Sequence, residues 1–81
     1  MTRLGSYLAK KSVNKAEISR RTGISKSRLS QLTSNDTTKL RADELYLIAL
    51  AMDIDPCEVF NEVCGHLKIN SNLWQMTPIK Y

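Results

Sequence analysis

The stretch that decides the fold is residues 15–32, which read KAEISRRTGISKSRLSQL. Two short segments with apolar residues at helical spacing lie on either side of a glycine. A glycine can adopt the left-handed backbone conformation in which a helix ends and the chain turns. The pattern therefore predicts two helices joined by a tight turn, each burying one face. Its structural positions are Ile18, Ser19, Gly23, Ile24, Leu29 and Leu32.

Apolar spacing predicts a helix on each side of this pair. In residues 3–11, Leu4, Tyr7 and Leu8 recur at helical intervals. The stretch 42–52 has the most regular apolar stripe of the chain, since its apolar residues recur three, four and seven positions after Leu45. Both patterns are typical of amphipathic helices.

Start signals locate a fifth helix and the beginnings of the two central ones. Asp55 is followed by a proline and then by Glu58, an order typical of a capped helix start. Asn14 and Glu17 have the same capping spacing, and Ser25 can cap the helix after Gly23. We expect the fifth helix to end at the glycine at position 65 and to bury its apolar residues, which are Val59, Phe60 and Val63.

Length and composition favour one small helical domain. The chain has 81 residues, of which 42% are hydrophobic but only 6% aromatic, so a single and mainly aliphatic core is expected. We predict an all-α fold of five helices over residues 1–65 and a tail over 66–81. The tail contains Trp74 and could form a short hairpin, an irregular strap or a dimer contact.

Several functional classes find no support in the residues. No apolar run approaches the roughly 20 residues of a membrane span, and the N-terminus lacks the apolar stretch of a signal peptide, so we expect a cytoplasmic protein without membrane contact. Cys57 and Cys64 are seven residues apart, which favours small apolar fillers over a redox or metal motif. His66 has no ligand cluster nearby. Without paired acids, a catalytic triad or metal spacing, we expect no enzyme, cofactor or metal.

Charge is distributed unevenly along the chain. Residues 1–41 hold ten Lys and Arg against two acids, a net charge of +8. Residues 42–81 hold two Lys against six acids, a net charge of −4. Such a distribution suggests that the surface around residues 15–32 faces a polyanion.

The stretch at residues 15–32 resembles the helix-turn-helix of the phage-repressor/Cro-type family, also called the xenobiotic-response-element type. This family places a glycine at the turn and apolar residues at the positions filled here by Ile18, Ile24, Leu29 and Leu32. The wider resemblance covers about residues 3–63 and implies a compact lambda-repressor-like DNA-binding domain. Thr22 stands where the family usually has an apolar residue.

The resemblance implies roles for the polar residues. The second helix of such a motif enters the major groove of DNA by its N-terminal part. Base-reading is expected of Lys26, Ser27 and Gln31, whose side chains can bond to base edges. Contacts with phosphates or the minor groove are expected of Lys15, Ser25, Arg28, Ser30, Ser34, Asn35, Lys39 and Arg41.

The leading interpretation is a sequence-specific regulator of transcription that binds double-stranded DNA. We expect a repressor that binds a two-fold symmetric operator as a homodimer, with the fifth helix and the tail as dimer contacts. One alternative is an antitoxin-like autoregulator whose tail binds a protein partner. Another is a protein-interaction module that uses the helical fold as a scaffold.

Overall fold

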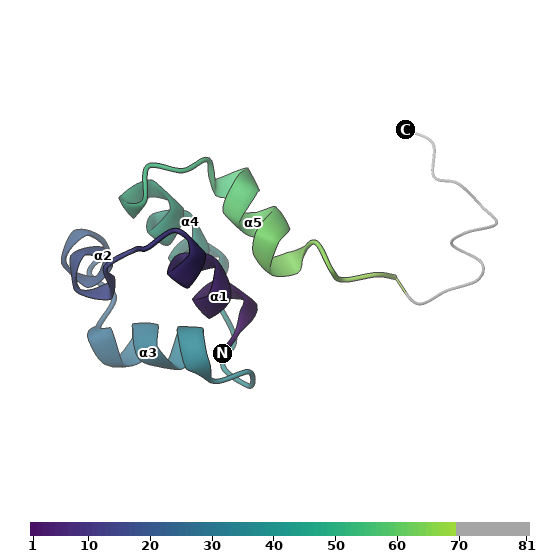
Figure 1. The fold of residues 1–81 in the computed structure, drawn as a ribbon, viewed down its shortest axis with the longest axis horizontal. Coiled ribbons are helices and arrows are strands. Elements are labelled where there is room, and N and C mark those ends of the chain that lie inside the picture. The colour runs from purple at the N-terminus through teal and green to yellow at the C-terminus, as the bar shows by residue number, and fades with distance from the viewer. Residues whose placement is uncertain (70–81) are drawn as a thin grey trace.

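The computed structural model describes residues 1–69, which form five helices and no strand (Figure 1). In chain order they are α1 (Arg3–Lys10), α2 (Lys15–Thr22), α3 (Lys26–Ser34), α4 (Ala42–Ala51) and α5 (Pro56–Cys64). The predicted all-α fold of five helices is confirmed. Within residues 1–69, no helix has the length and apolar content needed to cross a membrane. Most of the tail, including Trp74, lies outside the described residues. The predicted alternatives for its conformation therefore fall outside them too.

The predicted caps stand at the starts of three helices. Asn14 Oδ1 accepts a hydrogen bond from the backbone N–H two residues later at 2.8 Å. Ser25 Oγ accepts from the backbone N–H three residues later at 3.1 Å. Asp55 Oδ1 accepts from the backbone N–H two residues later at 2.9 Å. The spacing also predicts that the acid three residues after the cap accepts a bond from the backbone N–H of the cap residue. This second prediction is wrong for both helices. Glu17 pairs with a neighbouring arginine, and Glu58 accepts a hydrogen bond from a tyrosine on α1. A charged or buried partner competes well with a helix's own backbone for a carboxylate.

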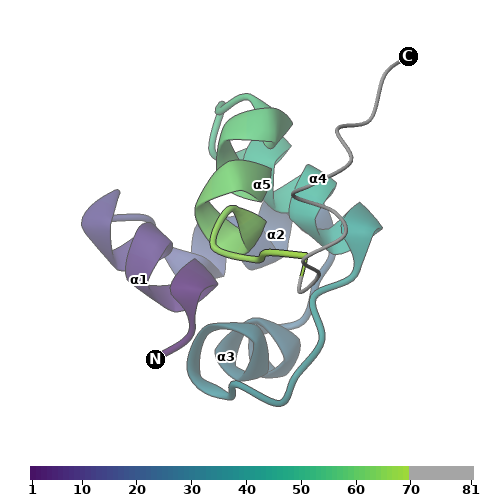
Figure 2. The same ribbon diagram turned by 90° about the vertical axis from the view of Figure 1, so that its right-hand side faces the viewer.

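One aliphatic core lies where the five helices meet. In space, α1 packs on α3 and α5, α2 packs on α3 and α4, and α4 packs on α5. The predicted apolar stripes of α1 to α4 all contribute to this core. The ribbon shows α3 lying across from α1 and α2, and it packs on both (Figures 1 and 2). The buried members of the core are Leu4, Tyr7, Leu8, Ile18, Leu29, Leu32, Leu45, Ile48, Ala49 and Val59.

The predicted buried face of α5 is partly wrong. Val59 is fully buried and Val63 is half-buried, but 56% of Phe60 is exposed. Adjacent residues of a helix point about 100° apart, and α5 packs along the Val59 side only. The prediction of a filler role is also wrong for Cys57, which is exposed on α5, whereas Cys64 is half-buried. Both thiols are free, and no cluster of His, Cys, Asp and Glu within residues 1–69 could hold a metal ion.

A close approach of α1 to the end of α3 fixes the orientation of α3. Thr2 caps α1, and its backbone N–H donates to the Thr33 carbonyl at 3.0 Å. The Thr2 hydroxyl donates to the Leu32 carbonyl at 2.7 Å. Gly5 permits this approach, because a Cβ atom at that position would collide with the Thr33 carbonyl oxygen. The C-terminal end of α3 is therefore attached to the start of α1.

Candidate nucleic-acid interface

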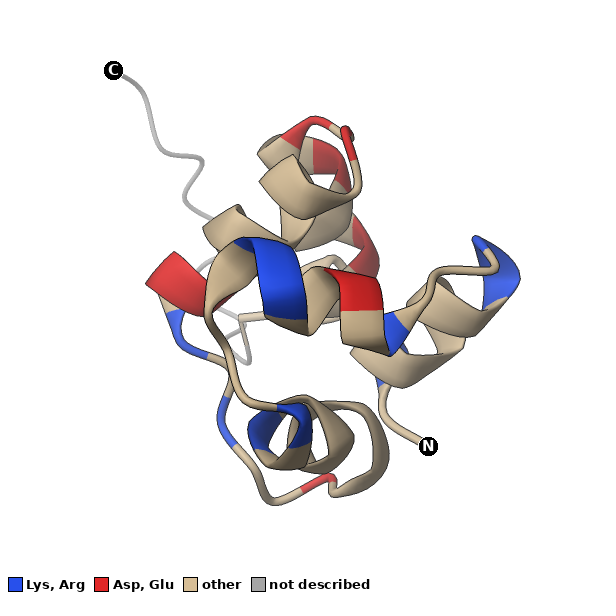
Figure 3. Ribbon diagram, turned by 90° about the vertical axis from the view of Figure 1, so that its left-hand side faces the viewer, with Lys and Arg blue, Asp and Glu red and all other residues tan. Residues whose placement is uncertain are grey.

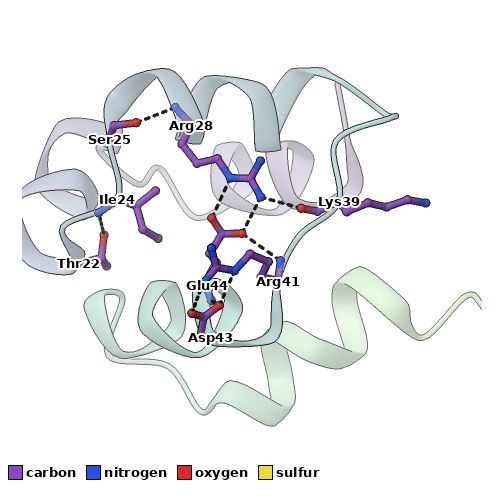
Figure 4. A network of polar contacts seen from close by, with 8 residues as sticks. All are labelled: Thr22, Ile24, Ser25, Arg28, Lys39, Arg41, Asp43 and Glu44. Atoms are coloured by element: carbon purple, nitrogen blue, oxygen red, sulfur yellow. Dashed lines mark hydrogen bonds and ion pairs between the residues drawn. The ribbon is translucent and has the colours of Figure 1, made fainter.

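The turn between α2 and α3 is closed by hydrogen bonds from consecutive residues. Gly23 has a φ of 81°, and its N–H donates to the Ser19 carbonyl at 2.9 Å. The Thr22 hydroxyl donates to the Ile18 carbonyl at 2.7 Å and accepts from the Ile24 N–H at 3.1 Å (Figure 4). Thr22, the polar departure from the family pattern, thus satisfies a backbone N–H that the turn would otherwise leave without a partner.

The two faces of α3 differ completely in exposure. Leu29, Leu32 and Thr33 are buried on one face, and they attach the helix to the core. The other face is turned to solvent along the whole helix. Its exposed residues are Lys26, Ser27, Ser30, Gln31 and Ser34. The spacing of three or four residues between most of them gives one continuous polar stripe.

The structure places the three expected base readers on this exposed stripe. Lys26 and Ser27 form the first turn of α3, directly after the cap residue, and Gln31 follows one turn later. Within residues 1–69, no hydrogen bond or ion pair involves these three side chains. Their ammonium, hydroxyl and amide groups are the kinds of group that bond to base edges in the major groove.

The residues expected to contact the DNA backbone surround this stripe. Lys15 is the first residue of α2 and Lys39 lies in the loop after α3, and both are exposed. Ser25 uses only its lone pair in capping, so its hydroxyl can still donate to a phosphate oxygen.

Two serines and an asparagine toward the C-terminal end of α3 are less uniform. Ser30 is exposed on the helix, but the Ser34 hydroxyl donates to the Ser30 carbonyl and is thereby engaged. Asn35 accepts from the Thr37 N–H and hydroxyl through its Oδ1 at 2.9 and 2.7 Å, which leaves its amide donors for a phosphate. Their contacts with DNA stay predictions.

Arg28 differs from the other expected phosphate contacts because its guanidinium is directed into the molecule. Its Nε donates to Glu44 Oε2 at 2.8 Å, and one terminal nitrogen donates to Glu44 Oε1 at 2.9 Å (Figure 4). The same nitrogen donates to the Lys39 carbonyl at 2.8 Å. Arg28 therefore connects α3 to the following loop and to α4, and its phosphate contact remains a prediction that these bonds oppose.

Glu44 is the central acceptor of this network and was missed in the sequence. It is 7% exposed, and its Oε1 also accepts from the Arg41 N–H at 3.0 Å. The hydrogen bonds from Arg28 hold the pKa of this carboxyl below its usual range, although burial opposes the shift. The pKa of the Arg28 guanidinium is raised in turn by the bond to Glu44. The sequence does carry a signal for Glu44, because an acid three residues after the cap residue has the spacing of a capping box. The signal is hard to recognise, since the cap residue here is an arginine and not a serine or threonine.

The intramolecular ion pair of Arg41 is much more exposed than that of Arg28. Its guanidinium pairs with Asp43 at 3.2 and 2.6 Å, but both side chains are more than half exposed. Exposed pairs contribute little to stability, so a phosphate can replace the carboxylate at small cost. Arg41 thus remains available for the predicted contact with the minor groove or its phosphates.

Three ion pairs of the fold neutralise basic side chains at the end of α1 and on α2. Arg20 pairs with Glu17, Arg21 with Asp53, and Lys11 with Glu58. Figure 3 shows basic positions on α3 and the loop after it, with acidic positions gathered around the turn between α4 and α5 at the opposite end. Acids also lie beside the basic end, namely Asp36 in the loop after α3, and Asp43 and Glu44, which pair with Arg41 and Arg28. The uneven charge of the sequence is therefore also uneven in space.

Comparison with known proteins identifies a family. The family model described as the Cro/C1-type HTH DNA-binding domain matches residues 3–65, which include all five helices. No curated protein and no solved structure matches the chain.

Proposed function

The chain belongs to the Cro/C1-type helix-turn-helix DNA-binding family, and from this premise we propose that it is a sequence-specific repressor of transcription. Membership implies DNA binding, whereas the operator, the sign of regulation and the residues that read bases are parts of the proposal. Repression would follow from occupation of promoter DNA. A cytoplasmic location and the lack of an enzymatic activity are likewise part of the proposal.

The observation that carries the proposal is the exposed stripe of α3. It presents Lys26, Ser27 and Gln31 without an intramolecular partner in the described part of the chain, on a helix held by the core and by the Arg28–Glu44 pair. A rigid helix with free donors and acceptors can discriminate between base pairs, because a mismatched base leaves a buried group unpaired. The lysines at positions 15 and 39 add attraction for phosphates.

We propose that two copies bind one two-fold symmetric operator, with half-sites about 34 Å apart. A single domain of this size buries too little DNA for high specificity at physiological salt. The predicted dimer contacts are α5 and the tail. Apolar side chains of that region stand in solvent, with Leu67 and Ile69 exposed by 66 and 57%. A second copy would cover such residues.

The test begins with selection of bound sequences from a random DNA pool. The selected DNA and a scrambled version of the same composition are then titrated with the protein at one fixed salt concentration. We expect the selected DNA to bind at least 10³-fold more tightly, as sequence-specific proteins do. Equal affinities for both would contradict sequence-specific recognition. A complex that sediments with only one protein chain on the DNA would contradict the proposed dimer but not sequence-specific recognition.

The exposed apolar residues after α5 also favour a second candidate. In an antitoxin-like autoregulator, Leu67 and Ile69 would contact another protein in place of a second copy of this chain. Co-purification of a stoichiometric partner that is lost in a variant with serine at both positions would favour this candidate. A self-associating protein would show no such partner.

A further inference from the structure

An open groove lies beside the core, away from the exposed stripe of α3. It has a volume of about 520 Å³ and is bordered by the start of α1, the loop between α3 and α4, the start of α4, and the end of α5. Its apolar lining consists of Leu4, Leu32, Leu40, Leu45, Phe60 and Val63. Cavities of this size commonly hold drug-sized apolar groups, so the groove can take an indole ring together with a neighbouring side chain.

The lining of the groove is unusual for a surface that faces water. Phe60 is 56% exposed, and the half-buried Leu40 and Val63 lie on the walls around it. Contiguous exposed apolar surface usually marks a contact site. Arg3, Lys39 and Arg41 contribute the cationic part of the rim.

The chain itself leaves α5 at this groove. His66, two residues after α5 ends, is part of the lining, and the next residues expose Leu67 and Ile69. The following twelve residues, 70–81, read NSNLWQMTPIKY. They carry four large apolar residues and no acid, and they begin with Asn-Ser-Asn, which favours a change of chain direction.

We propose that Leu73 and Trp74 of the same chain occupy this groove. From His66 to Trp74 the chain can span about 26 Å, since an extended residue covers about 3.3 Å, so the indole can return to the groove. A segment tethered so closely has an effective concentration of about millimolar, which favours it over a separate molecule. An indole face is also the best aromatic partner for the Arg and Lys groups of the rim.

The proposal connects the tail to the loop that follows α3. That loop forms one wall of the groove and carries Lys39 and Arg41, so an occupied groove would hold these residues in place. This consequence depends on the proposed DNA-binding function, whereas occupation of the groove does not. The test is therefore made without DNA.

Trp74 is the only tryptophan of the chain, so its fluorescence reports its surroundings directly. In the full-length protein we expect an emission maximum at shorter wavelength than that of tryptophan in water, and quenching by acrylamide several-fold weaker. Phe60→Ser should shift the emission toward that of water-exposed tryptophan. The matched control is Leu50→Ser, an exposed leucine on α4 that does not line the groove, which should leave the emission unchanged.

Three results would overturn the proposal. They are water-like emission in the unaltered protein, a blue shift insensitive to Phe60→Ser, and a blue shift that appears only as protein concentration rises, which would place the tail on a second copy. If Phe60→Ser loses its helical circular dichroism, nuclear Overhauser contacts in the unaltered protein decide instead. Contacts between the Trp74 ring and the methyl groups of Leu40 and Val63 are expected, and their absence would overturn the proposal.

Discussion

The Arg28 guanidinium and the Glu44 carboxylate form a two-point ion pair, at 2.8 and 2.9 Å, between the exposed helix α3 and the first turn of α4. The acid is 7% exposed, so removal of its partner would leave a nearly buried charge without compensation. The pair also includes the loop between the two helices through the Lys39 carbonyl and the Arg41 N–H. One carboxylate thus connects α3, the following loop and α4.

Replacement of Glu44 should make the free energy of unfolding less dependent on pH in the acid range. Glu44→Gln should lower the free energy of unfolding at neutral pH by about 1.5–3 kcal/mol, the range for hydrogen bonds to charged groups. The pKa of Glu44 is lowered in the fold, so its stabilisation is complete above the unfolded pKa of about 4.3 and is lost as the pH falls through the lower folded pKa. Urea unfolding at several pH values should show the two proteins converging in acid. A constant difference down to the lowest pH would contradict this role.

The two arginines near the loop should respond in opposite ways to removal. Arg28→Ala should lower the melting temperature, because it leaves Glu44 without its main partner. Arg41→Ala removes only an exposed pair and should leave the melting temperature unchanged. It should instead reduce the salt dependence of DNA binding by about one phosphate contact. An unchanged melting temperature of Arg28→Ala would contradict a structural role for Arg28.

The contact between α1 and α3 predicts that alanine at position 5 lowers the stability of the protein, the reverse of the usual effect of replacing a helical glycine. Alanine in place of glycine inside a helix usually stabilises by about 1 kcal/mol. Gly5→Ala should destabilise this protein instead, because the added methyl group would meet the Thr33 carbonyl oxygen. The matched control is Ser6→Ala, at an exposed position of the same helix. Thermal unfolding in which Gly5→Ala melts above the unaltered protein would show that α1 and α3 do not approach so closely.

Tyr7 should govern part of the alkaline unfolding. Burial, together with the 2.6 Å hydrogen bond that its hydroxyl donates to Glu58, raises its pKa to about 12. The folded pKa exceeds the unfolded value of about 10, so this stabilisation is complete below pH 10 and is lost as the pH rises toward 12. Tyr7→Phe should be less stable by about 1 kcal/mol at neutral pH and should lose less stability in the alkaline range. Tyr46→Phe, at an exposed position of α4, serves as control, and an alkaline profile of Tyr7→Phe parallel to the original would contradict the prediction.

The elements of the fold were predictable because their signals are local. Asn14, Ser25 and Asp55 cap helices in the structure as their sequence context indicates. Gly23 adopts the left-handed conformation that its place after α2 requires. Each of these signals acts within four residues, so one sequence suffices to recognise them.

Contacts between distant residues could not be predicted in the same way. The approach of Gly5 to Thr33 and the pairing of Arg28 with Glu44 each depend on how two helices are placed in space. The exposure of Phe60 follows from which side of α5 meets the core, and an apolar residue adjacent to a buried one gives no sign of it. The exposed stripe of α3 was predictable, because the burial of Leu29 and Leu32 leaves the opposite face to solvent.

The central claim is that the exposed stripe of α3 distinguishes DNA sequences, and the ratio of affinities for selected and scrambled DNA tests it most directly. At fixed salt, Lys26→Ala should lower this ratio by about 10-fold or more, the loss of one base contact. Lys15→Ala should weaken binding to both DNAs equally and keep the ratio, and Lys10→Ala, at the end of α1, should change neither. A ratio that stays the same in Lys26→Ala, Ser27→Ala and Gln31→Ala would contradict the claim that this stripe reads DNA.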